Sequence, residues 1–240
     1  MTADVPTPPP AATTEVLYAD DAIVVLVKPS GLLSVPGRGA DKQDCLSTRV
    51  QAAFADALVV HRLDMATSGL MVMARGAAVQ RTLSAAFATR NVVKRYEAVV
   101  HGEVTHAPNT WREIDLPIGV DWPNRPRRVI DREHGKPSIT RLQVSHFDAL
   151  RQLSHVLLEP ITGRTHQLRV HLLAIGHPIV GDALYAPPNV LAMAPRLMLH
   201  ACALSFAHPI SGRPLQFNRP GFTSLPAKAS LVAQGQPIGD

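Results

Sequence analysis

The chain has little of what marks a secreted, membrane-bound or disulfide-stabilised protein. Its 240 residues include only two cysteines, Cys45 and Cys202, which are too few for a disulfide framework and which we interpret as ordinary packing residues. No apolar run approaches the roughly 18 residues that a membrane-spanning helix needs. The N-terminus also lacks the apolar core of a signal peptide. We therefore expect a soluble cytoplasmic protein with no membrane partner.

The common signatures of nucleotide, hydrolase and metal sites are missing as well. The sequence contains no G-x-x-x-x-G-K-[ST] phosphate loop, no G-x-G-x-x-G fingerprint and no G-x-S-x-G elbow. Eleven histidines raise the question of a metal site, but none shows H-E-x-x-H spacing and the cysteines do not show C-x-x-C spacing. His166 and His171 are five residues apart, which separates them around a helix. We expect neither a metal ion nor a cofactor.

What the chain does have is apolar content and positive charge. Hydrophobic residues make up 46% and charged residues 18%, which suits one folded domain with a sizeable core. The formal net charge is +5 and the sequence pI is near 9.6, which favours a polyanionic partner. Five basic side chains fall within residues 125–136, opposed only by Asp131 and Glu133. These five are Arg125, Arg127, Arg128, Arg132 and Lys136.

The ends of the chain differ from its middle. Residues 1–14 are rich in Pro, Thr and Ala, which predicts a disordered N-terminal arm. Residues 221–240 show little pattern and predict a loose tail. No internal repeat or long linker interrupts residues 15–220, so we expect one domain there.

Local patterns predict an α+β domain. Strands are expected at residues 16–28 (a hairpin around Asp20 and Asp21), 58–63, 70–74, 94–104, 138–147, 152–159 and, as the final strand, 197–206. Helices are expected at residues 44–55 with Asp44 as cap, at 76–90 with Val79, Leu83 and Phe87 on one face, and from a Thr165 cap to Ile175 with Leu168, Leu172 and Ile175 as the apolar stripe. Many strands at hairpin spacing favour a mixed, largely antiparallel sheet flanked by helices and loops.

Asp64 is the most distinctive acidic residue. It follows the expected strand at residues 58–63 and precedes Thr67, Ser68 and Gly69. Such an aspartate can simply tighten a turn. However, Arg62 lies two positions earlier, so that on an extended chain both side chains point to one face. Gly69 marks a point where the backbone needs unusual freedom.

The motif around Asp64 resembles that of a known family. Residues 61–70 read HRLDMATSGL, which resembles the H-R-L-D-x-x-T-S-G-L motif of the RluA family of pseudouridine synthases. Further segments resemble other blocks of this family in the same order: 28–37 (KPSGLLSVPG), 94–96 (KRY), 163–171 (GRTHQLRVH), 176–182 (GHPIVGD) and 199–201 (LHA). The resemblance covers roughly residues 16–220. Residues 121–126 (DWPNRP) and 193–196 (MAPR) are similar to the dual-specificity branch of the family.

This resemblance implies a fold, a reaction and a set of site residues. It implies the pseudouridine synthase fold without an N-terminal S4 RNA-binding domain. It implies that the enzyme detaches uracil from the sugar at N1 and rejoins it through C5, without a cofactor. The implied catalytic residues are Asp64 as the essential carboxylate, Arg169 as its guanidinium partner and Tyr96 as the ring that stacks on uracil. Leu199 is implied as a wall of the pocket.

The resemblance also implies how RNA is bound. Arg62 is expected to enter the space that the flipped base leaves. We interpret Arg125, Arg127 and Arg128 as phosphate-binding residues, with a solvated loop as the alternative, and add Arg164 as a further contact. The implied substrates are stem-loops of tRNA, at uridine 32, and of 23S ribosomal RNA, at uridine 746. We expect no DNA partner and a monomer.

Several alternatives stay open at this stage. Asp64 can attack C1′ and form a covalent sugar intermediate, or it can remove a sugar proton and give a glycal. A non-catalytic RNA-binding or folding module on the same scaffold would not need Asp64, Tyr96 and Arg169 together. A hydrolytic glycosidase usually needs two carboxylates, and no second acid stands near the motifs.

Overall fold

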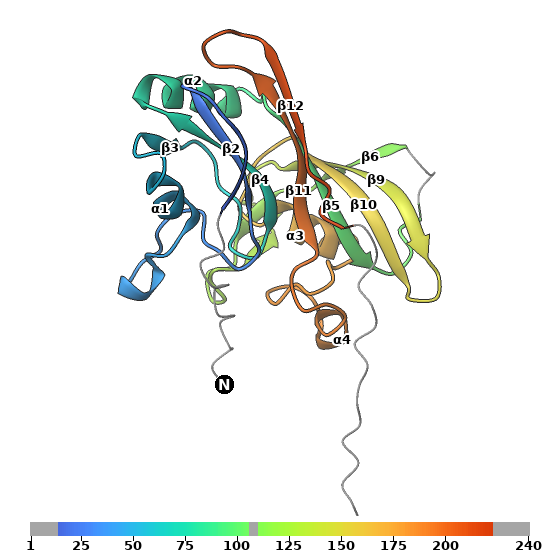
Figure 1. Ribbon diagram of the computed structural model, residues 1–240. Coiled ribbons are helices and arrows are strands. Elements are labelled where there is room, and N and C mark those ends of the chain that lie inside the picture. The colour runs from blue at the N-terminus through green and yellow to red at the C-terminus, as the bar shows by residue number, and fades with distance from the viewer. Residues whose placement is uncertain (1–13, 106–109, 223–240) are drawn as a thin grey trace, which may run out of the picture.

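One large sheet organises the molecule. The computed structural model describes residues 14–105 and 110–222, and its main sheet has ten strands. They follow the order β1-β2-β4-β11-β5-β10-β9-β6, with β3 paired to β4 and β12 paired to β11 (Figure 1). The strands are β1 Glu15–Ala19, β2 Ile23–Lys28, β3 Ala57–Val59, β4 Ser68–Arg75, β5 Val93–His101, β6 Trp111–Asp115, β9 Ile139–Asp148, β10 Leu153–Pro160, β11 Leu199–Ala207 and β12 Pro214–Asn218.

The sheet is mixed and largely antiparallel, as the sequence predicts. The pair β4–β11 is parallel, and the other pairs of the sheet are antiparallel. This parallel contact is short and aligns Ser68 with His200 and Gly69 with Ala201. Gly69 has a φ of 119°, and a Cβ atom there would overlap the backbone of Ala201. The expected need for backbone freedom at Gly69 is therefore confirmed, since only glycine allows the two strands to approach.

Within the described residues, four α-helices and a small second sheet complete the fold. The helices are α1 Leu46–Gln51, α2 Ala77–Ala88, α3 Gln167–Ala174 and α4 Pro188–Leu191, and a 3₁₀ turn spans Ala40–Lys42. In Figure 1, α2 lies beside the β2–β4 end of the sheet and α3 lies near β5, β10 and β11. The second sheet pairs β7 Ile118–Val120 with β8 Arg128–Ile130.

The buried faces of the helices match the predicted stripes. Val79 and Leu83 of α2 pack in one core cluster with residues of β2 and β4. Leu168 and Leu172 of α3 pack in another with residues of β5, β9 and β10. Cys45 and Cys202 are buried and free, which confirms their interpretation as packing residues.

The strand expected at residues 58–63 is shorter than predicted. β3 ends at Val59, and Asp64 lies in the loop that follows instead of at the strand end. The physical reason is a side chain. His61 Nε2 accepts the backbone N–H of Val72 at 3.1 Å, which is the next donor along β4 after the Val59–Met73 pair. The imidazole therefore replaces the backbone carbonyl that would have continued the ladder.

Two predicted helix caps were wrong. Asp44 does not cap α1, because its carboxylate is bound by Arg49 Nε at 2.7 Å and Nη2 at 2.6 Å. The helix starts after Cys45 and is shorter than residues 44–55. Thr165 does not cap α3. His166 holds that position with a left-handed φ of 56°, and the Gln167 side chain accepts the backbone N–H of Arg164 at 3.0 Å.

The strand expected at residues 197–206 is not the final one. β12 follows it and pairs antiparallel with β11. β12 alternates between exposed and half-buried residues, but this five-residue run that begins at Pro214 was not recognised as a strand. Strands β6, β7 and β8 were also not predicted.

The chain ends lie largely outside the described residues. The predicted arm at residues 1–14 and tail at residues 221–240 fall almost entirely there, and both stay predictions. Within residues 14–105 and 110–222, no helix is long and apolar enough to cross a membrane.

Candidate active site

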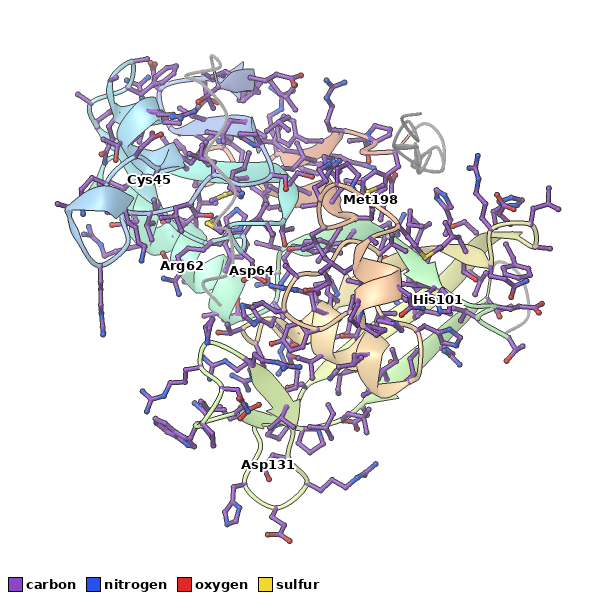
Figure 2. All side chains as sticks on the ribbon, turned by 90° about the horizontal axis from the view of Figure 1, so that it is seen from below. Cys45, Arg62, Asp64, His101, Asp131 and Met198 are labelled. Carbon is purple, nitrogen blue, oxygen red and sulfur yellow. The ribbon has the colours of Figure 1, made fainter. Side chains whose placement is uncertain are left out.

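A cavity of about 750 Å³ brings the distant motifs together. Its walls are made by side chains from four segments, within residues 33–35, 61–67, 87–96 and 160–169, together with Leu199. Asp64, Tyr96, Arg169 and Leu199 all line it, as do Arg62 and Arg164. Figure 2 shows Arg62 and Asp64 side by side near the middle of the molecule. Residues that are far apart in the sequence thus share one cavity.

The loop that carries Asp64 is tied to the segment after β2. Lys28 is fully buried, and its Nζ donates to the carbonyls of Pro29 at 2.8 Å, Leu32 at 2.7 Å and Met65 at 2.9 Å. The Ser30 hydroxyl donates to the Ala66 carbonyl at 2.7 Å. These bonds fix the backbone on the C-terminal side of Asp64. A flexible loop is thereby held in one conformation.

Lys28 and Ser34 add electrostatic and backbone constraints. Ser34 donates to the Leu63 carbonyl at 2.7 Å and accepts the Leu63 N–H at 3.1 Å, which fixes the N-terminal side of Asp64. Burial lowers the pKa of Lys28 to about 7, and the nearby charge of Asp64 opposes this shift. The three carbonyl acceptors match the three N–H donors of an ammonium group.

Asp64 presents a half-buried carboxylate to the cavity. Its side chain is 29% exposed, and Oδ2 lies 3.3 Å from Arg169 Nη1 and 3.9 Å from His166 Nε2. Arg169 comes from α3 and is 5% exposed. The structure therefore places the predicted guanidinium partner next to the predicted carboxylate, at the longer limit of a charge-assisted hydrogen bond.

Arg169 is held by a second carboxylate that sequence reasoning did not assign a role. Asp182 is almost fully buried, and it accepts Arg169 Nε at 2.8 Å and Nη2 at 2.6 Å. Asp182 Oδ1 also accepts the N–H groups of Leu184 at 3.0 Å and Tyr185 at 3.2 Å. Burial opposes ionisation of Arg169, but the bonds and charges of Asp182 and Asp64 outweigh it and raise the Arg169 pKa. The guanidinium is thus permanently charged and oriented.

A histidine and a tyrosine form another unpredicted contact beside Asp64. The Tyr185 hydroxyl accepts the backbone N–H of Arg128 at 2.8 Å and lies 2.7 Å from His166 Nδ1. The hydroxyl thus joins the Arg128 backbone to the His166 ring, and the other ring nitrogen, Nε2, lies 3.9 Å from Asp64 Oδ2. Burial lowers the pKa of His166, and Asp64 opposes this shift. The Arg169 guanidinium also lies over the Tyr185 ring, with Cζ 5.0 Å from the centre of the ring.

Tyr96 and Leu199 form the apolar part of the site. Tyr96 lies in β5 and packs against two of the core clusters. Its ring therefore lies where these two clusters meet. Burial and the charge of Asp64 raise its pKa, so the side chain is a neutral phenol. Leu199 begins β11, is 3% exposed and lines the cavity.

The predicted RNA-binding arginines divide into two groups. Arg62 and Arg164 are exposed and line the cavity. Arg125 and Arg127 do not line it. Arg125 lies over the Trp122 ring at 4.2 Å, and Arg127 lies over the Tyr185 ring at 5.5 Å. Arg128 borders a neighbouring hollow.

No metal centre is evident in the described part of the chain. Within residues 14–105 and 110–222, no group of three or more His, Cys, Asp or Glu side chains is placed to hold a metal ion. His171 is instead bonded to Thr140 and to the Leu116 carbonyl, each at 2.9 Å.

Comparisons with known proteins agree on one family. The sequence profile described as RNA pseudouridylate synthase matches residues 22–174. The dual-specificity RNA pseudouridine synthase RluA of Escherichia coli strain K12 is 48% identical over 213 residues, which cover 89% of this chain and 95% of that protein. The enzyme of the same name from Yersinia pestis is 50% identical over 202 residues, which cover 84% of this chain and 96% of that protein.

A solved structure shares the fold. Human RNA Pseudouridylate Synthase Domain Containing 1 superposes with a TM-score of 0.71 at 28% identity, over 92% of this chain and 86% of that protein.

Proposed function

This chain belongs to the RNA pseudouridylate synthase family and isomerises uridine to pseudouridine in RNA, and we propose that Asp64, Arg169 and Tyr96 form its reactive centre. The observation that carries this proposal is the Asp64 carboxylate, half-exposed in a cavity and 3.3 Å from a buried guanidinium. A carboxylate in that setting faces a fixed positive charge and stays accessible to a ligand.

The reaction needs little beyond positioning and charge. The N1–C1′ bond breaks, the uracil turns within the cavity, a C5–C1′ bond forms, and a proton moves from C5 while N1 gains one. Asp64 serves this sequence either by attack on C1′ or by removal of a sugar proton. Both routes require a fixed anion, which Arg169 and the Lys28-anchored loop provide. A uracil that stays inside the cavity while detached does not exchange with solvent.

Tyr96 and Leu199 hold the base. The half-buried Tyr96 ring offers a stacking surface. Its raised pKa keeps the side chain protonated, so that no phenolate is available to remove the C5 proton, which favours a stacking and hydrogen-bonding role. Leu199 closes the cavity on the β11 side and keeps water from the detached base.

Arg62 and the outer arginines bind the RNA. Arg62 is exposed at the mouth of the cavity, where its planar guanidinium can stack in place of the extruded uridine and bond to phosphate. Arg164 lies on the opposite lining segment, with its Nε 3.4 Å from the Pro137 carbonyl. Arg125, Arg127 and Arg128 extend this basic surface along the β7–β8 hairpin and make phosphate contacts.

The substrates we propose are stem-loops from two kinds of RNA. The relatives from Escherichia coli and Yersinia pestis are named dual-specificity enzymes. By this likeness the targets are uridine 32 of certain tRNAs and uridine 746 of 23S ribosomal RNA. A protein acting on these RNAs works in the cytoplasm, and the site is complete within one chain, so we propose a monomer.

The test is tritium release from RNA labelled at uracil C5. The wild-type protein is expected to release tritium without free uracil, whereas hydrolysis would release the base. Asp64→Asn is expected to abolish release, with a loss of at least about 10⁴-fold, and to bind RNA as before. Retained activity in Asp64→Asn would refute the assignment of the carboxylate.

The RNA targets are tested separately. Pseudouridine mapping in total RNA from cells with and without the gene is expected to show signals that vanish at uridine 32 of tRNA and uridine 746 of 23S RNA. A signal that vanishes elsewhere would replace these two sites and leave the assignment of Asp64 intact.

A further inference from the structure

A second hollow lies beside the active-site cavity. It has a volume of about 600 Å³ and is bordered by β7, the turns on either side of β8 and residues 163–165. Residues 163–165 line both hollows. Figure 2 shows the β7–β8 region, with Asp131 in its outer turn, projecting away from the part of the molecule that holds Asp64. We call this second hollow the side groove.

The side groove is lined by cations without carboxylate partners. Arg128, Lys136 and Arg164 border it, and within the described residues none of the three forms an ion pair with an acidic side chain. Arg128 Nε is buried and has no hydrogen-bond partner among those residues. A buried donor without a partner is costly, so Arg128 Nε is available to an acceptor that a ligand brings.

The acidic residue of the side groove does not neutralise these cations. Asp131 Oδ1 accepts the backbone N–H groups of Glu133 at 3.1 Å and His134 at 2.9 Å. These bonds lower the Asp131 pKa and hold the anionic carboxylate in its own turn, where its ion-pair partner among the described residues is His134 and not one of the three cations. Three cationic side chains therefore remain available to an anion.

An exposed aromatic ring completes the side groove. Trp122 is 64% exposed and belongs to the lining. Its loop is ordered by bonds from Asn124 to Asp121, including Nδ2 to Oδ1 at 3.0 Å. With Arg125 at 4.2 Å from its ring centre, the Trp122 ring offers a platform on which a planar base can stack.

We propose that the side groove binds a second unpaired nucleotide of the substrate loop, whose base stacks on Trp122 and whose flanking phosphates meet Arg128, Lys136 and Arg164. The proposal rests on the proposed function, since the RNA must enter the cavity next to the side groove. It adds a specificity determinant: the enzyme selects loops that place an unpaired base near the target uridine. An unpaired nucleotide matches both parts of the lining, because its base is a planar ring for Trp122 and its flanking phosphates are anions for the three cations.

The first test observes the stacking directly. The chain has two tryptophans, so Trp111→Phe leaves Trp122 as the only indole. In an Asp64→Asn/Trp111→Phe protein, a synthetic tRNA anticodon stem-loop with uridine at position 32 is expected to quench tryptophan emission as it binds. Abasic substitution at one loop position is expected to restore the emission and so identify the stacked base. Unchanged emission while labelled RNA saturates the protein in anisotropy would overturn the proposal.

The second test measures the effect on turnover with matched controls. Trp122→Ala is expected to raise KM for the stem-loop by about 5- to 100-fold with kcat changed by less than about threefold, whereas Trp122→Phe restores most of the affinity. Lys136→Ala is expected to reduce the slope of log affinity against log salt by about 0.7. Arg213→Ala removes the same charge from an exposed site in the β11–β12 turn and is expected to leave the slope unchanged.

These results separate the side groove from the active site. If the wild-type protein releases no tritium, the proposed function fails, while the quenching experiment, which needs no turnover, still tests the side groove. If the wild-type protein is active and Trp122→Ala has the same KM, or if Lys136→Ala and Arg213→Ala have equal slopes, the side groove does not bind RNA.

Discussion

Arg169 stands between two carboxylates that differ in exposure. Asp182 is 1% exposed and binds the guanidinium through two hydrogen bonds, whereas Asp64 is 29% exposed and lies 3.3 Å away. The buried partner therefore fixes the position of the guanidinium, and the remaining Nη1 faces the carboxylate of Asp64. Asp182 acts through Arg169 and is a positioning residue.

Replacing Asp182 tests this division of roles. Asp182→Asn keeps the shape but leaves Arg169 with one anion, so we expect the free energy of unfolding to fall by about 3 kcal/mol. Since a small displacement of a catalytic group is costly, kcat should fall by about 100-fold. Urea unfolding and single-turnover assays measure the two effects.

The matched control for this replacement is a surface pair. Asp56→Asn breaks the pair between Asp56, 47% exposed, and Arg75 at 3.1 Å, and it should cost less than about 1 kcal/mol with no change in kcat. Equal effects of the two substitutions would show that Asp182 has no special role.

His61 makes the Asp64 loop sensitive to acid. Its Nε2 accepts the Val72 N–H, which requires a neutral ring, and burial lowers its pKa from 6.5 to about 3. Between these values the unfolded chain binds the proton and the folded protein does not. The free energy of unfolding should therefore fall as the pH drops from about 6.5 toward about 3, by roughly 1 kcal/mol for each pH unit.

The matched substitution is His61→Gln, which keeps an acceptor but does not titrate. Urea unfolding at about pH 7 and about pH 5 should show that the advantage of the wild-type protein over His61→Gln shrinks in acid. Parallel pH profiles for the two proteins would contradict this role of the imidazole.

At the scale of single residues, the sequence predicted part of the site. Asp64, Tyr96, Arg169 and Leu199 were found because they stand in recognisable motifs, and the structure places them in one cavity; their roles stay proposals. The positioning contacts were missed. Lys28 contacts the carbonyl of Met65, 37 residues away, and no local pattern reports such a contact.

The short parallel pair β4–β11 is the element on which the site depends. Asp64 precedes β4, Leu199 begins β11, and Tyr96 pairs across from Ala201. Because β11 lies between β4 and β5, three motifs that are distant in the sequence converge at one point of the sheet. This arrangement requires a close approach of the β4 and β11 backbones at Gly69.

Gly69→Ala should therefore disrupt the sheet itself. Its φ of 119° is strained for any L side chain, and the added methyl would overlap the Ala201 backbone, so we expect a loss of at least about 3 kcal/mol or insoluble protein. Gly163→Ala is the control, since an added methyl there meets nothing within 4 Å. Its melting temperature should stay within a few degrees of the wild type. A stable Gly69→Ala protein would contradict the close approach of the two strands.

Element boundaries were harder to predict than element types. The apolar, β-branched pattern at residues 58–63 is typical of a strand, but the His61 side chain takes the next ladder donor and ends β3 at Val59. Similarly, Asp44 has the right chemistry for a cap, but Arg49 binds both of its oxygens. In both places a single side-chain contact overrode the local pattern.

For the whole molecule, the position of the charge matters more than its total. The net charge of +5 predicts a polyanionic partner but does not say which face binds it. Several basic side chains gather near the cavity and the side groove, among them Arg62, Arg128, Lys136 and Arg164. By contrast, Arg81 on α2 and Arg213 in the β11–β12 turn are exposed and line neither hollow.

Two double variants separate these effects. Arg127→Gln/Arg128→Gln and Arg81→Gln/Arg213→Gln each remove two positive charges, so net charge alone predicts equal losses of RNA affinity. If the β7–β8 hairpin contacts phosphates, the first variant should flatten the slope of log affinity against log salt by about 1.4, whereas the second should leave it unchanged. Anisotropy with a labelled stem-loop across a salt series measures both slopes. Equal slopes would mean that this hairpin is a solvated loop and that the RNA lies along another face.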